Sequence, residues 1–423
     1  MTTSLPAGPL ADDRQAAQAR VLRTLVAAQV LSGAGLAAGL TVGALLAQDM
    51  LGSDSYAGIP AALLTAGSAG AAVLVGRISN ARGRRRGLGL GYTAGALGAV
   101  LVVLAADLGS VALLFPALLV YGAGTATNLQ ARYAAADLAA PEQRGRAVSR
   151  VLLATTFGAV AGPNAVSLMG DLADGLGFPR LAGPFLLGAA AYGLAGAVLL
   201  LWLRPDPLLL ARSLAARPAE TSPGGGADPS TPLATRSLVL LGGMILVVAQ
   251  LVMVAIMTMT PVHMRNHGHS LDAAGAVIAA HIAGMYLTSP LTGRLVYLFG
   301  SRVVAALAGA TLALSGLLAA VAPTGSPLGL AVPLVLLGVG WNLGLLSGTA
   351  ILADAAPLAI RARVQGAVDL CVALAAAGGG VGSGVVMGAT SYPVLSILGA
   401  VVGVAVVPVI AIAARRRAEE RVG

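Results

Sequence analysis

The sequence predicts an all-α polytopic membrane protein with twelve membrane-spanning helices in two six-helix halves. Hydrophobic residues make up 57% of the 423 positions and charged residues 10%, against roughly 45–50% and 25% in soluble domains. Long apolar runs recur along the whole chain, and several residues repeat at one fixed offset. The composition excludes a disordered chain, and the single cysteine, Cys371, excludes a disulfide scaffold.

The net charge of +9 does not indicate nucleic-acid binding. All 26 basic residues are arginines, and they lie in short clusters between apolar runs, not on one face of a folded domain. We therefore expect a lipid bilayer, and no nucleic acid, as a partner of this chain.

Each membrane-spanning helix needs roughly 20 apolar residues to cross a hydrocarbon core of about 30 Å. Glycine and alanine recur along the apolar runs, and small residues let helices approach closely in lipid. The runs between charged or Gly/Pro-rich breaks predict spans at 21–48, 57–76, 88–106, 110–130, 148–169, 181–203, 237–260, 273–293, 302–322, 327–352, 364–388 and 393–413.

The arginines predict the orientation of the spans, because cytoplasmic loops are enriched in Lys and Arg. With the N-terminus in the cytoplasm, all but two of the 26 arginines fall inside, and only Arg180 and Arg265 fall outside. Both termini are then cytoplasmic, and we expect the chain in the cytoplasmic membrane of a bacterium. The polar first 20 residues and the long first apolar run predict no cleaved signal peptide.

Two repeated halves are predicted. The expected parts are a cytoplasmic tail (1–20), an N-terminal half (21–203), a flexible Pro/Gly-rich linker (204–236), a C-terminal half (237–413) and a second tail (414–423). At an offset of 217, Gly76-Arg77 matches Gly293-Arg294, Gly83 matches Gly300, Arg85 matches Arg302, Asp137 matches Asp354, Arg144 matches Arg361 and Arg146 matches Arg363. Parallel repeats place a cavity between the halves, where alternating access operates.

The loop after the second span resembles the signature of the major facilitator superfamily, which has Gly, then Asp four residues later, then Gly-Arg-Arg. It reads Gly76-Arg77-Ile78-Ser79-Asn80-Ala81-Arg82-Gly83-Arg84-Arg85-Arg86. The resemblance implies the fold of that superfamily and a gating role for Arg77, Gly83, Arg84 and Arg85. Asn80 stands where the family has Asp, and we hypothesise that Asp369 pairs with an arginine of the 82–86 cluster. A solvated, positively charged loop is the alternative interpretation.

Ionisable groups inside a membrane are the first functional candidates. Asp49, Asp107 and Asp272 are expected at helix ends, and no carboxylate is expected at mid-membrane in spans 1, 4 or 7. This disfavours a proton-coupled exporter, which needs a group whose charge changes with access. An exporter or exchanger of small organic molecules stays the alternative function, with an apolar cavity and polar anchors at Gln29, Asn128, Gln250, Trp341 and Asn342.

Histidine and methionine gather in one region. The four histidines all lie between positions 263 and 281, and Met253, Met257, Met259, Met264 and Met285 lie nearby. Met253/Met257 and His281/Met285 are each spaced i, i+4, so each pair shares one helix face. If the seventh and eighth spans pack as a hairpin, a ladder of these four side chains is expected. An outer metal-capture group would then comprise His263, Met264, His267 and His269.

Thioether and imidazole groups bind soft cations, with Cu(I) favoured by thioether and copper, zinc, iron or nickel by imidazole. Methionine is also a common filler of helix interfaces, and a membrane histidine often only hydrogen-bonds a neighbouring helix. From these residues alone, metal handling and ordinary packing both stay open.

The pairs Met253/Met257 and His281/Met285 also resemble the metal-binding pairs of CcoA-like copper importers, a branch of the major facilitator superfamily. So does the run from Arg132 to Leu138. The resemblance implies copper uptake with copper as substrate, and copper chaperones or oxidase assembly factors as partners. The direction and the coupling ion stay open, as does a transport-inactive metal sensor. Cys371 is read as a core residue or a further soft ligand. No enzymatic motif and no cofactor are indicated.

Overall fold

The computed structural model describes residues 9–51, 59–216 and 232–408, which are helical and contain no β-strand. In the first half, short 3-10 helices at Pro141–Gln143 and Arg180–Ala182 join longer α-helices. These are α1 (Pro9–Leu51), α2 (Ile59–Arg82), α3 (Arg84–Asp107), α4 (Val111–Asp137), α5 (Arg144–Asn164), α6 (Val166–Gly175) and α7 (Gly183–Trp202).

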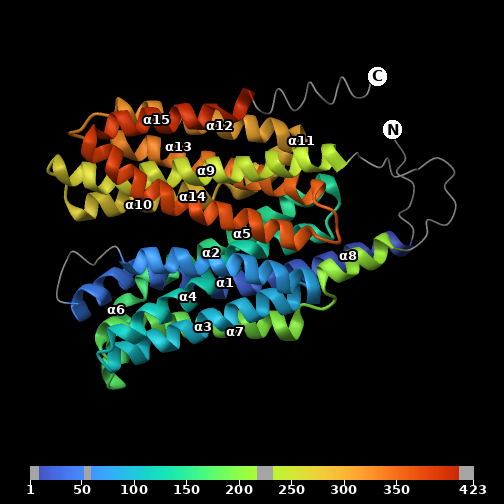
Figure 1. The fold of residues 1–423 in the computed structure, drawn as a ribbon, viewed down its shortest axis with the longest axis horizontal. Helices are drawn as coiled ribbons and strands as arrows, with labels where there is room; N and C mark the ends of the chain where they lie inside the picture. Colours follow the sequence, from blue (N-terminus) through green and yellow to red (C-terminus); the bar gives the residue numbers. More distant parts are fainter. Residues whose placement is uncertain (1–8, 52–58, 217–231, 409–423) are drawn as a thin grey trace.

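A short helix, α8, follows the first half and leads to the second (Figure 1). The bounds of α8 and of the helices of the second half are α8 (Pro207–Ala215), α9 (Pro232–Asn266), α10 (Leu271–Tyr286), α11 (Ser289–Phe299), α12 (Ser301–Ala320), α13 (Pro327–Ala355), α14 (Arg361–Ala389) and α15 (Tyr392–Val404). Within the described ranges, nine helical stretches are long and apolar enough to cross a membrane. The count of twelve spans and the cytoplasmic termini stay predictions.

The helices pack as two groups, one above the other in Figure 1. In the first group α1 packs against α5 and α7, and α3 packs against α4 and α7. In the second, α13 packs against α9, α10 and α12, while α15 packs against α12. The groups meet chiefly where α2 packs against α14 and where α5 packs against α11. Any passage between the halves must therefore separate these two helix pairs.

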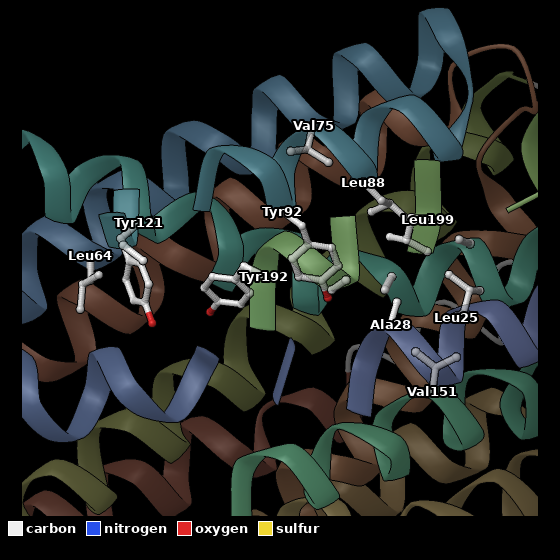
Figure 2. Packing of buried hydrophobic residues seen from close by; sticks show 14 of the residues in the cluster. Leu25, Ala28, Leu64, Val75, Leu88, Tyr92, Tyr121, Val151, Tyr192 and Leu199 are labelled. Carbon is white, nitrogen blue, oxygen red and sulfur yellow. The ribbon is translucent and has the colours of Figure 1, made fainter. Parts of the chain in front are cut away.

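The core of the first group consists mostly of Leu, Ala and Val, and it also contains a row of tyrosines packed against glycines. Figure 2 shows Tyr92, Tyr121 and Tyr192 in a row, and Tyr192 lies 5.7 and 5.4 Å from the other two ring centroids. A Cβ on Gly124 would lie only 2.3 Å from the Tyr192 ring, so the glycine makes room for it. The Tyr92 and Tyr192 rings are stacked, and the Tyr121 ring is tilted against Tyr192. Rings of this size bury large areas and contribute strongly to the core of this half.

The observed helices differ from the expected organisation in two interrupted spans and in the linker, among other places. Two spans, 148–169 and 273–293, are each interrupted: α5 gives way to α6 at Ala165, and α10 gives way to α11 after Tyr286. Part of the linker predicted to be flexible is the helix α8. Its N-terminus is capped by Asp206, whose carboxylate accepts the backbone N–H groups of Leu208 and Leu209. Pro207 at the first helical position also favours helix initiation.

The repeated glycines have structural reasons. A Cβ on Gly76 would lie 2.8 Å from the Ala362 carbonyl oxygen, and one on Gly293 would lie 2.8 Å from Ser149. These positions let α2 approach α14 and α11 approach α5. Gly83 and Gly300 have φ angles of +88° and +80°, a region that glycine alone enters cheaply. The repeat therefore preserves both the contacts between the halves and the turns that precede α3 and α12.

Candidate functional site

A cavity of about 350 Å³ lies between the two helix groups. Its lining extends along α2 from Pro60, at the end away from the arginine clusters, to Ala72 near mid-helix. Most lining residues are apolar; the polar ones are Thr65, Ser68, Tyr121, Thr125, Asn128, Gln250, Tyr286, Trp341 and Asp369. A largely apolar cleft of this size with a few polar groups is typical of small-molecule sites.

Asp369 of α14 lies at the end of this cavity nearest the arginine clusters. Its Oδ1 accepts a hydrogen bond of 2.6 Å from Nη2 of Arg132 and one of 3.0 Å from the Tyr133 hydroxyl. Arg132 and Tyr133 belong to α4, so this buried ion pair joins the two halves. Oδ2 of Asp369 is buried and has no hydrogen-bond partner among the described residues.

The partner of Asp369 differs from the one hypothesised from the sequence. Asp369 pairs with Arg132 and not with an arginine of the 82–86 cluster. The reason is the length of α4, which continues to Asp137 where the sequence predicted an end near 130. The extra turns carry Arg132 into the helix bundle opposite α14. The sequence predicted no carboxylate at mid-membrane in spans 1, 4 or 7, whereas the eleventh predicted span supplies one to the cavity, because Asp369 lines it.

A second set of ion pairs lies beyond Asp369, towards the arginine clusters. Arg84 donates to Asp137 at 2.8 Å and also to the side chain of Gln365 on α14. Arg361 of α14 lies 3.9 Å from Asp137. Arg144 of α5 pairs with Asp354 of α13. These contacts hold the halves together at the arginine-rich end.

Burial, together with the nearby positive charge of Arg361, lowers the pKa of the Arg144 guanidinium to about 10. Arg144 therefore stays protonated at neutral pH, so its contact with Asp354 is ionic. Asp354 is 43% exposed, and screening by water limits the strength of this pair. The fully buried Arg84–Asp137 pair has no such screening.

The helix α8 connects both halves at the same end. Arg212 donates to the backbone and side-chain oxygens of Asn80 on α2, at 2.8 and 2.9 Å. It also donates to the carbonyl oxygens of Leu358 and Ala359, at 2.9 and 3.0 Å, just before α14. Arg212 thus places a positive charge beside Asn80, at the position where the family signature has the negative charge of an Asp. Sequence reasoning missed Arg212, because its partners are backbone carbonyls far away in the chain.

Besides Asp369, the four signature-loop residues predicted to act in gating have different surroundings. Arg84 takes part in the ion pairs between the halves. Gly83 packs against the Asp206 carboxylate, and the backbone N–H of Arg85 donates to the same carboxylate at 2.8 Å. Arg77 is exposed. The structure therefore brings Arg84 to the interface and Gly83 and Arg85 to α8.

The residues of the predicted metal ladder are partly brought together. Met253 and Met285 are buried and both line the cavity. His281 is fully buried, and its Nδ1 lies 2.7 Å from the Leu334 carbonyl oxygen, so Nδ1 carries the proton. Its Nε2 has no partner among the described residues. Met257 is half-buried in the apolar cluster of the second half and is not among the residues that line the cavity.

The predicted outer metal-capture residues are engaged in packing and in hydrogen bonds. The His263 ring lies between the rings of Tyr392 and His267, at 4.4 Å from each centroid. His267 and His269 contact the carbonyl oxygens of His263 and Thr324, at 2.8 and 2.7 Å. Met264 is fully buried. The described residues contain no group of three or more His, Cys, Asp or Glu arranged for a metal.

The predicted polar anchors divide into two sets. Asn128, Gln250 and Trp341 line the cavity. Gln29 is buried behind it and donates to Thr155, while Asn342 is buried and donates to Ser289. Cys371, expected to be buried, is exposed on α14. The cavity therefore offers amides, hydroxyls, two thioethers and one carboxylate.

Comparison with known proteins decides the family. The model of the Major Facilitator Superfamily matches residues 25–270 and 239–423, which together cover most of the chain. The chain belongs to the major facilitator superfamily. The chain is therefore a multi-pass membrane transporter of this superfamily.

Individual members of the superfamily differ widely in their similarity to the chain. YdeG, an uncharacterized transporter of Bacillus subtilis, is 52% identical over 92% of this chain and 91% of its own length. RfnT, a riboflavin transporter of Brucella anthropi, is 30% identical over 82% and 83%. The solved proton:xylose symporter XylE has a TM-score of 0.72 at 15% identity, covering 93% of this chain and 95% of XylE, which supports the fold alone.

Proposed function

We propose that the chain moves a small organic solute across the membrane by alternating access, and that protonation of Asp369 couples this movement to a proton gradient. The observation that carries the proposal is the position of Asp369. It lies in the cavity between the halves and forms the ion pair with Arg132 that joins them. A coupling group must sense both the solute and the state of the interface, and Asp369 both lines the cavity and pairs across the interface.

Protonation removes the negative charge that holds Arg132. The Arg132–Asp369 contact then weakens, and the remaining pairs, Arg84–Asp137 and Arg144–Asp354, hold the arginine-rich end with less support. Separation of α2 from α14 and of α5 from α11 would open the cavity to that side. Rocking of the halves in this manner is how parallel repeats produce alternating access.

Riboflavin is the first solute to assay, because RfnT, named as a riboflavin transporter, is 30% identical to this chain. The test is flux of riboflavin in proteoliposomes with and without an imposed pH gradient. Asp369→Asn is expected to abolish the response to the gradient. Asp107→Asn is the matched control, because Asp107 is exposed at the end of α3. Flux in Asp369→Asn that still follows the gradient contradicts this role for the carboxylate.

Copper uptake is the second candidate function, and one observation favours it. His281 donates from Nδ1 to a backbone carbonyl and leaves Nε2 unpartnered among the described residues, an arrangement that metal-ligating histidines use to orient the ring. Met285 lies one turn away on the same helix and, with Met253, lines the cavity.

Cellular copper content tests this second candidate. Met253→Ala and His281→Ala are expected to lower copper accumulation relative to wild type at equal expression. Met259→Ala is the control, because Met259 is half-buried on the same helix as Met253 and does not line the cavity. Wild-type copper content in both ligand variants excludes these residues as copper ligands.

A further inference from the structure

We propose that the solute is an uncharged, planar heteroaromatic molecule that donates an N–H group to Oδ2 of Asp369 and packs its ring against Trp341. This inference rests on the proposed function, since it names the class of solute that the same cavity takes. It is carried by three features of the lining: one unpartnered acceptor, a balanced charge and an oriented aromatic pair.

The acceptor is Oδ2 of Asp369. The other oxygen, Oδ1, is already occupied by donors from Arg132 and Tyr133, at 2.6 and 3.0 Å. Oδ2 has no donor among the described residues, although Asp369 is only 4% exposed and lines the cavity. An unsatisfied buried carboxylate oxygen is costly. A solute that brings an N–H group removes this cost and gains a charge-assisted hydrogen bond.

The charge of the lining favours an uncharged solute. Asp369 is the one ionisable acid or base among the described lining residues, the tyrosines aside. Its negative charge is compensated by Arg132 directly behind it. A net charge on the solute would therefore be buried without a counter-ion, which is strongly unfavourable in a low-dielectric site.

The aromatic pair is formed by Trp341 of α13 and Tyr286 of α10, which both line the cavity. Their ring centroids are 5.9 Å apart at an angle of 71°. The indole N–H of Trp341 donates to the Gln250 side-chain oxygen at 2.8 Å. This bond fixes the plane of the indole and satisfies its polar edge, so the ring offers the solute an apolar surface. Aromatic solutes pack on such surfaces in offset or edge-to-face geometry.

Matched probes test the N–H donor without altering the protein. Riboflavin carries an imide N–H that 3-methylriboflavin lacks, and uracil carries N–H groups that 1,3-dimethyluracil lacks. Binding of each probe to the purified protein in lipid nanodiscs is measured by equilibrium dialysis. We expect at least one N–H probe to bind about tenfold or more tightly than its methylated partner, as a hydrogen bond to a charged group predicts. Riboflavin 5′-phosphate, an anion, is expected to bind more weakly than riboflavin.

Two variants tie that preference to the named residues. Asp369→Asn is expected to remove most of the difference between an N–H probe and its methylated partner. Trp341→Ala is expected to weaken binding of both members of a pair about tenfold, while Trp341→Phe keeps most of the affinity. Trp202→Phe is the control, because Trp202 is 62% exposed on α7 and does not line the cavity.

The outcomes separate this inference from the proposed function. Equal binding of both members of each pair, or full binding by Trp341→Ala, overturns the inference. A solute such as xylose that moves with the pH gradient, while the aromatic probes do not bind, also overturns it but leaves the proposed function standing. If none of these solutes shows proton-coupled flux, the proposed function itself is contradicted.

Discussion

At the scale of single residues, the contact between Arg132 and Asp369 is the most consequential one. Both side chains are nearly fully buried, and they come from different halves of the chain. A buried ion pair adds little net stability, because desolvation of both charges offsets their attraction. Removing one partner is different, since the remaining charge then has no counter-ion. Loss of one partner is therefore expected to destabilise the protein far more than the intact pair stabilises it.

Arg132→Ala is expected to destabilise the protein by about 3–5 kcal/mol and to abolish transport, because it leaves the buried Asp369 charge uncompensated. The double variant Arg132→Met/Asp369→Leu is expected to regain most of the thermal stability, since no buried charge remains. It should still fail to respond to a pH gradient. Thermal unfolding in detergent and flux in proteoliposomes measure the two effects. A double variant no more stable than the single one would show that charge is not the cause.

The turn before α3 gives a second prediction at this scale. Gly83 and Gly300 both have positive φ, but a Cβ on Gly83 would lie 2.3 Å from the Asp206 carboxylate, whereas one on Gly300 would meet no described atom within 4 Å. Both alanine variants carry the backbone strain of about 1–3 kcal/mol. Gly83→Ala should therefore lower the melting temperature more than Gly300→Ala, and equal losses would contradict the role of Asp206.

At the scale of elements, α8 serves as a clamp between the halves. Its N-terminus is tied through Asp206 to the turn before α3, and its Arg212 is tied to Asn80 and to the loop before α14. A helix that contacts both halves at one end must release at least one of them when that end opens. The contacts that α8 makes with the two halves therefore depend on whether the arginine-rich end is closed or open.

Arg212→Ala is expected to shift the population towards opening at the arginine-rich end, because four hydrogen bonds that span the halves are lost. Pulsed electron paramagnetic resonance would then show longer distances between spin labels placed on α2 and α14 near this end. Ser213→Ala is the matched control, since the Ser213 hydroxyl donates within α8, to the Leu210 carbonyl oxygen, and to no other residue that the structure describes. Unchanged distances in Arg212→Ala would contradict the clamp.

The sequence predicts elements better than it predicts their partners. Apolar runs and arginine positions locate most helices, because bilayer thickness and charge asymmetry act on local stretches of chain. The partner of Asp369 was not predictable, because an arginine just beyond the end of a predicted span, such as Arg132, does not reveal that the helix continues or which distant helix it faces. The helix α8 was missed because its Pro/Gly-rich surroundings conceal a short capped segment. Met253, Asn128 and Gln250, which line the cavity, could be singled out from the sequence because polar and soft side chains stand out in apolar helices.

At the scale of the whole molecule, the two halves contact each other through equivalent residues. Arg144 of the first half pairs with Asp354 of the second, and Arg361 of the second lies near Asp137 of the first. These four residues are the ones repeated at the offset of 217. Arg132 likewise donates to Thr349 at 3.0 Å, a residue at the same offset. The interface therefore has an approximate two-fold character.

This arrangement predicts the effect of exchanging charges. Arg144→Asp alone places two carboxylates together and should lower transport and stability. Combining it with Asp354→Arg is expected to restore part of both, since the attraction is re-formed with the charges exchanged. Flux and thermal unfolding of the two single variants and the double variant provide the test. Additive losses in the double variant would argue against direct pairing.

The crossed pairs also bear on the ancestry of the chain. A six-helix ancestor that dimerised around a rotation axis would have made its Arg–Asp contact twice, with identical copies on either side. Fusion of two genes would preserve both contacts while freeing each copy to diverge. In such a chain, a substitution at one position is compensated in the opposite copy and not in its own. Arg84 has no counterpart in the second half, since Ser301 stands at its offset, so the Arg84–Asp137 pair is a contact that a symmetric ancestor of this kind would have had to make twice or not at all.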